Sequence, residues 1–264
     1  MFSGLTAAAL VNYWVVALLI GVDHDPAFSW ISDLAARGEP GGWRFALLDA
    51  LSGVAVVAFG LLLWHARERA IGGADSGDAG LDPAPADSSQ RAGAGNPSHP
   101  RGEVDPTRVP ESNMLVSGTP VSGASRGGGA LRWGLILLIA SGALAVADAL
   151  LPVSCARSLG EGCVRAGDLV DDLHEIESAL AVLATGGAML LTGIGLRRGG
   201  GARWLAALSL LGGVAFLLLS GLISMRESVE AFNDYKGWLQ RGGQLVLGAW
   251  LVAMAFVPRG RRPR

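Results

Sequence analysis

The chain has 264 residues, half of them hydrophobic, with a mean hydropathy of +0.40 and a formal net charge of −2 at pH 7. The apolar residues form long runs separated by polar segments, which excludes an ordinary soluble domain, where they are spread along amphipathic elements. The near-neutral charge gives no indication of a nucleic-acid partner, and none is predicted.

Six apolar runs are each long enough for a helix that crosses the ~30 Å hydrocarbon core of a bilayer, which takes about 20 residues. In chain order the runs are Leu5–Val22, Trp43–Trp64, Leu131–Leu151, Leu173–Gly195, Arg203–Ser224 and Trp238–Val257. Several begin or end at a tryptophan, as expected for rings at headgroup depth. The sequence therefore predicts an all-α fold, with one membrane domain that is a bundle of six transmembrane helices.

The first run has an alternative interpretation as a cleaved signal peptide. The residues before Leu5 carry no basic side chain, the run is longer than a usual signal-peptide core, and no clear cleavage site follows it. We interpret the run as a retained transmembrane helix. Cleavage would leave five spans and place the N-terminus outside.

The segment between the first two runs has the pattern of a short amphipathic helix at the outer interface. Asp25 and Pro26 are typical of a helix start, and Phe28, Ile31 and Leu34 recur at a spacing of three. We expect this helix to be an anchor. The alternative is a lid over a site that opens outward.

Residues 65–130 form the longest polar segment. They contain no aromatic residue and no cysteine, and Gly, Ser, Asp, Ala and Pro dominate. Such a composition cannot bury enough apolar surface to offset the entropy lost on ordering. We predict a disordered cytoplasmic linker between membrane segments 1–64 and 131–264.

Arginines indicate the orientation, because cytoplasmic loops of membrane proteins are enriched in basic residues. On the proposed inner side they are Arg67, Arg69, Arg126, Arg132, Arg197, Arg198, Arg203, Arg259, Arg261, Arg262 and Arg264. Both termini are therefore predicted to be cytoplasmic. The excess of arginine over a single lysine, Lys236, indicates GC-rich coding DNA, so we expect the cytoplasmic (inner) membrane of a bacterium.

Two cysteines, Cys155 and Cys163, share one predicted outer loop. On the oxidising side of a membrane such a pair usually forms a disulfide, which is our interpretation. A metal or redox pair is the alternative.

Ionisable groups inside a span are costly and point to function by default. Asp49 and Asp148 are predicted at similar depth in the outer leaflet, and Arg241 enters the sixth span from the same side. An Asp–Arg pair between helices would be purely structural. The alternative is a role in moving a substrate or proton.

The densest polar constellation precedes and opens the fourth run, between Asp168 and Ser178. Acidic residues there are typical of a helix start, and we favour that structural interpretation. The alternative is a site in which His174 binds a metal or acts as a general base. The candidate metal ligands are His24, His174 and Glu175, and no cofactor is predicted.

Short motifs connect the chain to a known family. Ile31-Ser32-Asp33-Leu34 and Trp43-x-Phe45 resemble the bacterial and archaeal membrane proteins of the domain of unknown function 998 family, as do Pro152-x-x-Cys155, Cys163 and His174. The resemblance implies a six-helix bundle and no assigned activity. It carries over Ser32, Asp33 and His174 as positions of interest. The long insert and Ala35, where the family often has Gly, depart from its pattern.

Three functional hypotheses follow. We rank first a non-enzymatic cell-envelope protein that binds a lipid or protein partner through its outer face. The second is a membrane hydrolase or transferase acting on lipid head groups, whose candidate catalytic residues are Ser32, Asp33, Asp148, Asp172 and His174. It requires these groups to converge on one water or metal ion. The third is a small-solute or proton transporter that uses Asp49 and Asp148.

Overall fold

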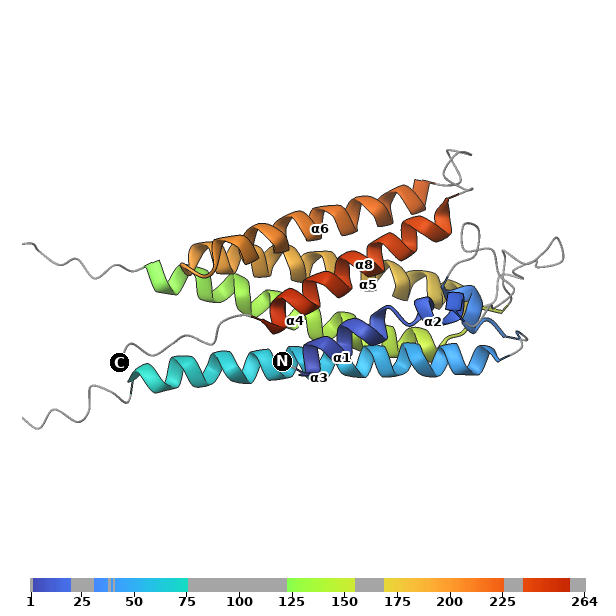
Figure 1. Cartoon of the computed structure of the whole chain (residues 1–264), viewed down its shortest axis with the longest axis horizontal. Coiled ribbons are helices and arrows are strands. Elements are labelled where there is room, and N and C mark those ends of the chain that lie inside the picture. Colours follow the sequence, from blue (N-terminus) through green and yellow to red (C-terminus); the bar gives the residue numbers. More distant parts are fainter. Residues whose placement is uncertain are drawn as a thin grey trace, which may run out of the picture. The chain divides into compact units, whose positions relative to one another are not determined.

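The computed structural model describes residues 2–19, 31–37, 39, 41–75, 123–154, 169–225 and 235–256, whose regular structure is helical throughout (Figure 1). The α-helices are α1 (Phe2–Val11), α2 (Trp14–Leu19), α3 (Gly42–Asp75), α4 (Gly123–Leu150), α5 (Leu169–Arg198), α6 (Arg203–Ser224) and α8 (Lys236–Ala255). A 3₁₀ helix, η1, covers Ser32–Ala35. The predicted all-α class is confirmed.

The chain divides into two compact units. The first comprises Met1–Glu68 and Ser122–Arg264, and the second is Arg69–Val121. The candidate site and the helices around it lie in the first unit, which we call the membrane domain.

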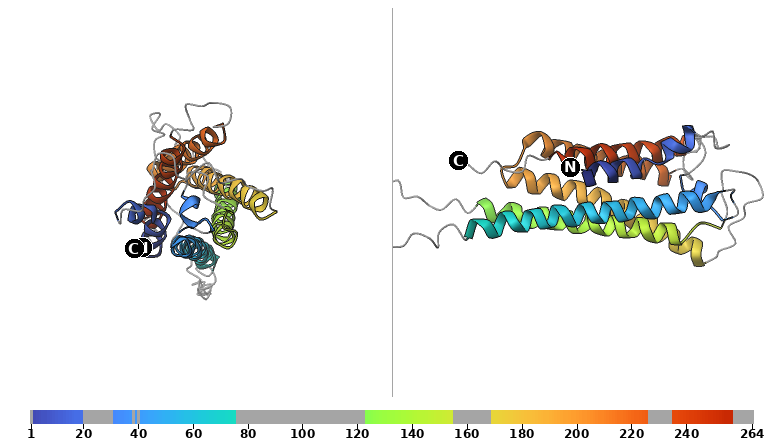
Figure 2. Two further views of the ribbon diagram at one scale, coloured as in Figure 1. Left: turned by 90° about the vertical axis from the view of Figure 1, so that its right-hand side faces the viewer. Right: turned by 60° about the horizontal axis from the view of Figure 1, so that its bottom comes forward.

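The helices of the membrane domain form a ring in which each packs on two neighbours (Figure 2). α1 packs on α8, α8 on α6, α6 on α5, and α5 on α4. α4 meets α3 where Gly142 lies against Gly53, so close that a Cβ on either would clash with the other's carbonyl oxygen. A Cβ on Gly4 of α1 would likewise clash with Ala255 of α8 and with Phe59 of α3. α1 therefore contacts both helices and closes the ring.

Neighbouring helices run antiparallel, and contacts at glycines fix their register. The contacts pair Gly53 with Gly142 and Gly60 with Ile139 (α3 and α4), Gly187 with Leu137 and Gly195 with Leu131 (α4 and α5), Gly186 with Leu217 and Gly193 with Leu210 (α5 and α6), and Gly4 with Ala255 and Gly248 with Ala8 (α1 and α8). In each pair of helices the residue number rises along one and falls along the other. The start of α1 and the end of α8 therefore lie at the same end of the ring.

Four helices in the described residues are long and apolar enough to cross a membrane: Gly42–Arg69, Gly128–Leu150, Leu169–Arg198 and Arg203–Ser224. Their outward faces carry large apolar side chains that are half or more exposed, which lipid favours and water does not. Examples are Leu47, Leu62, Leu183, Leu211 and Leu218. The chain is therefore a multi-pass membrane protein, and these four helices coincide with four of the six predicted spans.

The first predicted span, Leu5–Val22, is not one continuous helix. α1 ends at Val11, and α2 begins at Trp14. Between them the Asn12 amide donates to the carbonyl of Ala8 (2.9 Å), and the backbone N–H of Tyr13 donates to the carbonyl of Leu10 (3.1 Å), three residues back. The side chain thus competes with the helical ladder and the backbone tightens, which breaks the helix.

The sixth predicted span, Trp238–Val257, falls on α8, which does not reach the apolar composition of the other four helices. Gln240, Arg241 and Gln244 interrupt its first turns. Arg241 is buried, and both glutamines line the cavity described below. The polar groups of α8 therefore face the interior of the ring. Hydropathy averaged along the sequence includes them without showing which way they point.

The predicted linker, residues 65–130, is too long at both ends. α3 continues to Asp75 and α4 begins at Gly123, so residues 65–75 and 123–130 are helical. At the α3 end, Ala, Arg and Glu are strong helix formers. Arg67 also donates to the carbonyl of Gly128 (3.2 Å), which ties the two helices together. Residues 76–122 lie outside the described part of the chain.

Over one end of the ring lies η1 (Figure 2). The Ile31 N–H donates to Oε1 of Gln240 on α8 (2.7 Å), and the Arg37 N–H donates to the carbonyl of Val153, just after α4 (3.0 Å). The side chains packed together around η1 are those of Tyr13, Trp14, Ile31, Leu34 and Phe45. Of the predicted outer helix the structure describes the part from Ile31 onward, where η1 lies, while Asp25, Pro26 and Phe28 lie outside the described residues.

Candidate functional site

The register of α4 and α5 brings polar side chains together at one end of the ring. From the contact between Leu137 and Gly187, eleven residues forward on α4 lead to Asp148, and ten residues back on α5 lead to Glu177. Because the helices are antiparallel and rise equally per residue, these two carboxylates lie at the same level. His174, one turn before Glu177, projects from the same face of α5.

His174 is held by two contacts of one ring nitrogen. Its Nδ1 lies 3.0 Å from Oδ1 of Asp148 and 3.1 Å from the carbonyl oxygen of Leu151. A carbonyl oxygen only accepts hydrogen bonds, so the contact with Leu151 is a hydrogen bond when Nδ1 carries a proton, and Nε2 is then the ring nitrogen that can meet a metal ion or substrate. The same arrangement orients metal-binding and general-base histidines in other proteins.

Glu177 is the unusual member of the cluster formed by Asp148, His174 and Glu177. It is only 6% exposed, and neither of its carboxylate oxygens accepts a hydrogen bond from the described part of the chain. Its carboxyl group lies beside that of Asp148. Two adjacent carboxylates repel each other, and Glu177 has no donor of the kind that His174 provides to Asp148, so this arrangement calls for a bound cation or a shared proton.

Asp148, His174 and Glu177 have the geometry of a metal site. One ligand atom from each lies within 4.8 Å of the others, and His174 and Glu177 are buried. Two carboxylate oxygens and an imidazole nitrogen suit Zn²⁺, Mn²⁺ or Fe²⁺. Three protein ligands leave coordination positions for water and substrate, as in catalytic rather than structural sites.

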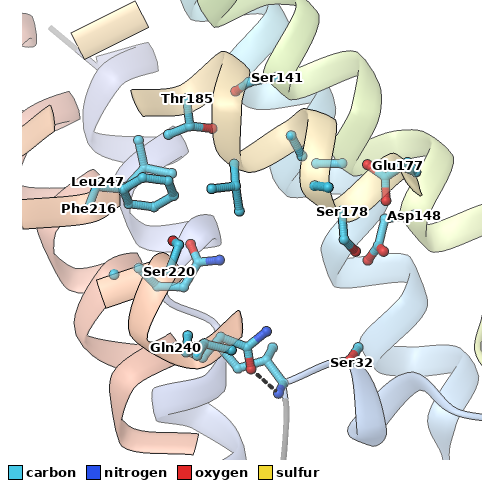
Figure 3. Close-up of a pocket in the computed structure, with 18 of the residues that line it drawn as sticks. Ser32, Ser141, Asp148, Glu177, Ser178, Thr185, Phe216, Ser220, Gln240 and Leu247 are labelled. Carbon is cyan, nitrogen blue, oxygen red and sulfur yellow. Dashed lines mark hydrogen bonds between the residues drawn. The ribbon is translucent and has the colours of Figure 1, made fainter. Parts of the chain in front are cut away.

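The cluster forms part of the wall of a cavity of about 760 Å³ between the helices of the ring. Asp148, Glu177 and Ser178 line one side, and Phe216 and Leu247 lie across from them (Figure 3). The volume falls in the range of small-molecule sites, and the mixed lining fits a ligand with a polar and an apolar part.

The cavity reaches the outer surface of the ring between α5 and α6. Ala179 and Leu183 of α5 and Gly221 of α6 line it, although all three are exposed. Farther along, Gly186 packs against Leu217, which closes the gap. The mouth is bordered by small and apolar residues of two membrane-crossing helices, so a lipid-like molecule could enter it sideways.

A second acidic residue of α5 has a structural role. Asp171 is buried and accepts hydrogen bonds from the backbone N–H of Ser154 (2.9 Å) and from its hydroxyl (2.6 Å). These bonds tie the start of α5 to the segment after α4. They hold the two helices that carry the cluster, in line with the structural interpretation of acidic residues at this helix start.

The structure places the predicted catalytic candidates in three different settings. Asp148 and His174 are in contact, and Ser32 lines the cavity from η1. Asp33 is fully buried and is not among the residues that line the cavity. Asp172 is exposed and does not line it either.

The predicted metal and intramembrane candidates are also separated. Glu175 is exposed at the mouth of the cavity, whereas Asp49 lines its interior. Arg241 is 3% exposed and lies with its guanidinium 5.7 Å from the ring centroid of Trp14, away from the lining. His24, Cys155 and Cys163 lie outside the described residues, so the predicted disulfide stays a prediction.

Two residues of the site were missed as candidates: Glu177 and Tyr13. Asp171, His174 and Glu177 recur every three residues, and all three are buried, so a strict spacing of three would have identified Glu177. Tyr13 had no signal in the sequence, because its inward direction depends on the helix break at Asn12.

Comparison with known proteins identifies the family of the chain through a match to its second half. Residues 112–257 match the family described as protein of unknown function (DUF998), and this segment contains α4, α5, α6 and α8. The motifs around Ser32 and Trp43 lie outside the matched segment, whereas Asp148, His174 and Glu177 lie within it. No curated protein and no solved structure matches the chain.

Proposed function

The chain belongs to the DUF998 family of unknown function, and from that premise we propose that it is a metal-dependent membrane hydrolase that cleaves an ester or phosphoester bond in a lipid head group. The observation that carries this proposal is the convergence of Asp148, His174 and Glu177 on one point of the cavity wall. Of the residues that the hydrolase hypothesis named, Asp148 and His174 meet here, and Glu177 joins them; a purely structural helix start does not need such a group.

The chemistry follows from the ligand set. Asp148, His174 and Glu177 would hold a divalent ion, which would acidify a water and polarise the carbonyl or phosphoryl oxygen of the substrate. Hydrolysis would then join the water oxygen to the carbonyl carbon or the phosphorus. The bond to the leaving oxygen would break, and that oxygen would take up the proton released by the water.

The mouth between α5 and α6 supports a lipid as the substrate. Its border of Ala179, Leu183 and Gly221 would face acyl chains if these helices cross the membrane. The apolar side of the cavity, with Phe216 and Leu247, would take part of a chain while the head group meets the cluster. A fully polar substrate would gain nothing from this half of the lining.

For the topology we propose six membrane passes, with both termini in the cytoplasm of a bacterial cell and the site near the outer face. The antiparallel ring, and the contact between Gly4 and Ala255 at its two ends, support an even number of passes. The arginines that favour the cytoplasm lie at the end of the ring opposite the cluster. They include Arg67, Arg132, Arg197, Arg198 and Arg203.

The other two hypotheses make different use of the same features. A non-enzymatic protein that binds an envelope partner or a lipid does not require polar groups to converge in a cavity. A transporter gains one specific support, because Asp49 and Asp148 both line the cavity. Metal binding without lipid cleavage would favour transport of the ion.

The test is lipid cleavage by the purified protein. Wild type would be mixed with phosphatidylethanolamine and phosphatidylglycerol vesicles and Zn²⁺ or Mn²⁺, and the products identified by mass spectrometry. We expect products that a chelator abolishes and that His174→Ala reduces about 100-fold or more.

The matched control for this test is Asp172→Ala, which removes an exposed group on the same helix and should keep the wild-type rate. Intact lipids in the presence of bound metal would contradict the hydrolase. Equal cleavage by wild type and His174→Ala would also contradict it.

A further inference from the structure

The cavity contains a third carboxylate that the metal cluster does not use. Asp49 of α3 lines the cavity, and Asp148 and Tyr13 are its electrostatic neighbours. Asp49 also interacts electrostatically with Glu177. Three acidic side chains therefore share the interior of the cavity, with Glu175 at its mouth, and only Asp148 and Glu177 belong to the metal cluster.

The position of Asp49 follows from the crossing of α3 and α4. Asp49 precedes Gly53 by four residues, about 6 Å along α3, and Asp148 follows Gly142 by six residues, about 9 Å along α4. Because the helices are antiparallel, both shifts are in the same direction. The two carboxylates thus lie at nearly the same depth, on neighbouring walls.

Tyr13 gives the second, independent observation. Its side chain is 4% exposed, it lines the cavity, and its ring packs beside Phe45 with centroids 6.2 Å apart. The Asp49 carboxyl group is its nearest hydrogen-bond partner, but the pair falls short of full hydrogen-bond geometry and the hydroxyl has no other partner within the described part of the chain. A buried hydroxyl whose hydrogen bonding is incomplete is stabilised when a ligand or water completes it.

The charges indicate what such a ligand carries. Asp148 and Glu177 would balance a divalent ion, and Asp49 is not part of the metal cluster. Arg241 interacts electrostatically with Tyr13, but its guanidinium packs over the ring of Trp14 and does not line the cavity. Asp49 is only partly buried and lines the cavity, so a cationic group of a ligand held there could pair with its carboxyl group.

We propose that Asp49 and Tyr13 form a subsite for the ammonium group of an amine-bearing amphiphile. An ammonium has three donors, and the Asp49 carboxylate and the Tyr13 hydroxyl oxygen can accept two of them. The inference rests on the proposed function, because the subsite would orient an amino head group next to the metal cluster. The apolar wall at Phe216 and Leu247 would hold the chain of the same molecule.

Binding of two matched probes tests this inference. Dodecylamine and dodecanol have the same chain and differ in the head group, and each would be titrated into metal-loaded protein while the melting temperature is recorded. We expect wild type to bind dodecylamine at least about tenfold more tightly than dodecanol. Asp49→Asn should bring the two affinities together, and Tyr13→Phe should reduce the preference in part.

The charge-matched control is Asp172→Asn, which removes an exposed carboxylate outside the cavity and should keep the full preference. Equal binding of the two probes by wild type, or a preference that survives Asp49→Asn, overturns the inference. The metal content of the same samples tests the proposed function separately, because Asp49→Asn should keep its metal. If wild type holds no metal, the hydrolase proposal is rejected. The difference in affinity between dodecylamine and dodecanol still tests the amine subsite.

Discussion

Glu177→Gln is expected to stabilise the metal-free protein and to abolish its stabilisation by a divalent ion. The Glu177 carboxylate is buried beside Asp148, and neither of its oxygens accepts a hydrogen bond within the described residues. Glutamine keeps the shape and removes the repulsion, which is worth about 1–3 kcal/mol in a buried setting. The same change removes a metal ligand. Wild type should gain about 2.7 kcal/mol from an ion at 100 times its Kd.

The measurement is the melting temperature of wild type and variant in chelator and in saturating Zn²⁺ or Mn²⁺. The variant should melt above wild type in chelator and below it in metal. Glu175→Gln is the control, because Glu175 is two residues away, exposed and outside the cluster. If the ion stabilises Glu177→Gln as much as wild type, Glu177 is not a ligand.

Gly142→Ala is expected to destabilise the membrane domain by about 1–3 kcal/mol. The added Cβ would stand 2.7 Å from the carbonyl oxygen of Gly53 and 2.9 Å from the backbone nitrogen of Val57. Backbone atoms of a packed helix cannot give way as a flexible side chain can, so α3 and α4 must separate. The separation would also displace Asp49 from Asp148.

Gly129→Ala provides a control of opposite sign in the same helix. A Cβ at Gly129 meets nothing within 4 Å, so the substitution should only add helix propensity, worth up to about 1 kcal/mol. Thermal unfolding and the yield of monodisperse protein would compare the two variants. Equal stability of Gly142→Ala and wild type would show that the close crossing of α3 and α4 is not required.

The membrane helices were predictable because lipid selects for them by composition. Runs such as Arg203–Ser224 are apolar on nearly every side, so hydropathy alone finds them, and α6 has the predicted limits. α8 was predicted by its apolar second half. Its first turns escape a composition criterion because Gln240 and Arg241 face inward.

The breaks and extensions of helices were harder to predict. One polar residue, Asn12, ends α1 through a side-chain bond to the backbone, and the same residue type is often accommodated within a helix. The polar composition after His65 indicated disorder, but helix propensity and the contact from Arg67 to Gly128 extend α3 and α4.

Single residues of the site could be predicted from the sequence, but their arrangement could not. Asp148 and His174 were candidates because ionisable groups near a span are costly. Their contact depends on the register of α4 against α5, which is fixed by glycines more than a helical turn away, such as Gly187 and Gly195. That register is a long-range property, and periodicity within one helix does not contain it.

The central claim is that Asp148, His174 and Glu177 bind a divalent metal ion, and metal content tests it most directly. The protein would be purified without chelator, loaded with Zn²⁺ or Mn²⁺, desalted and analysed by mass spectrometry for metal per chain. We predict about one ion per chain for wild type and for Asp172→Ala, and almost none for His174→Ala or Glu177→Gln. A wild type without bound metal, or variants that retain as much as wild type, would contradict the claim.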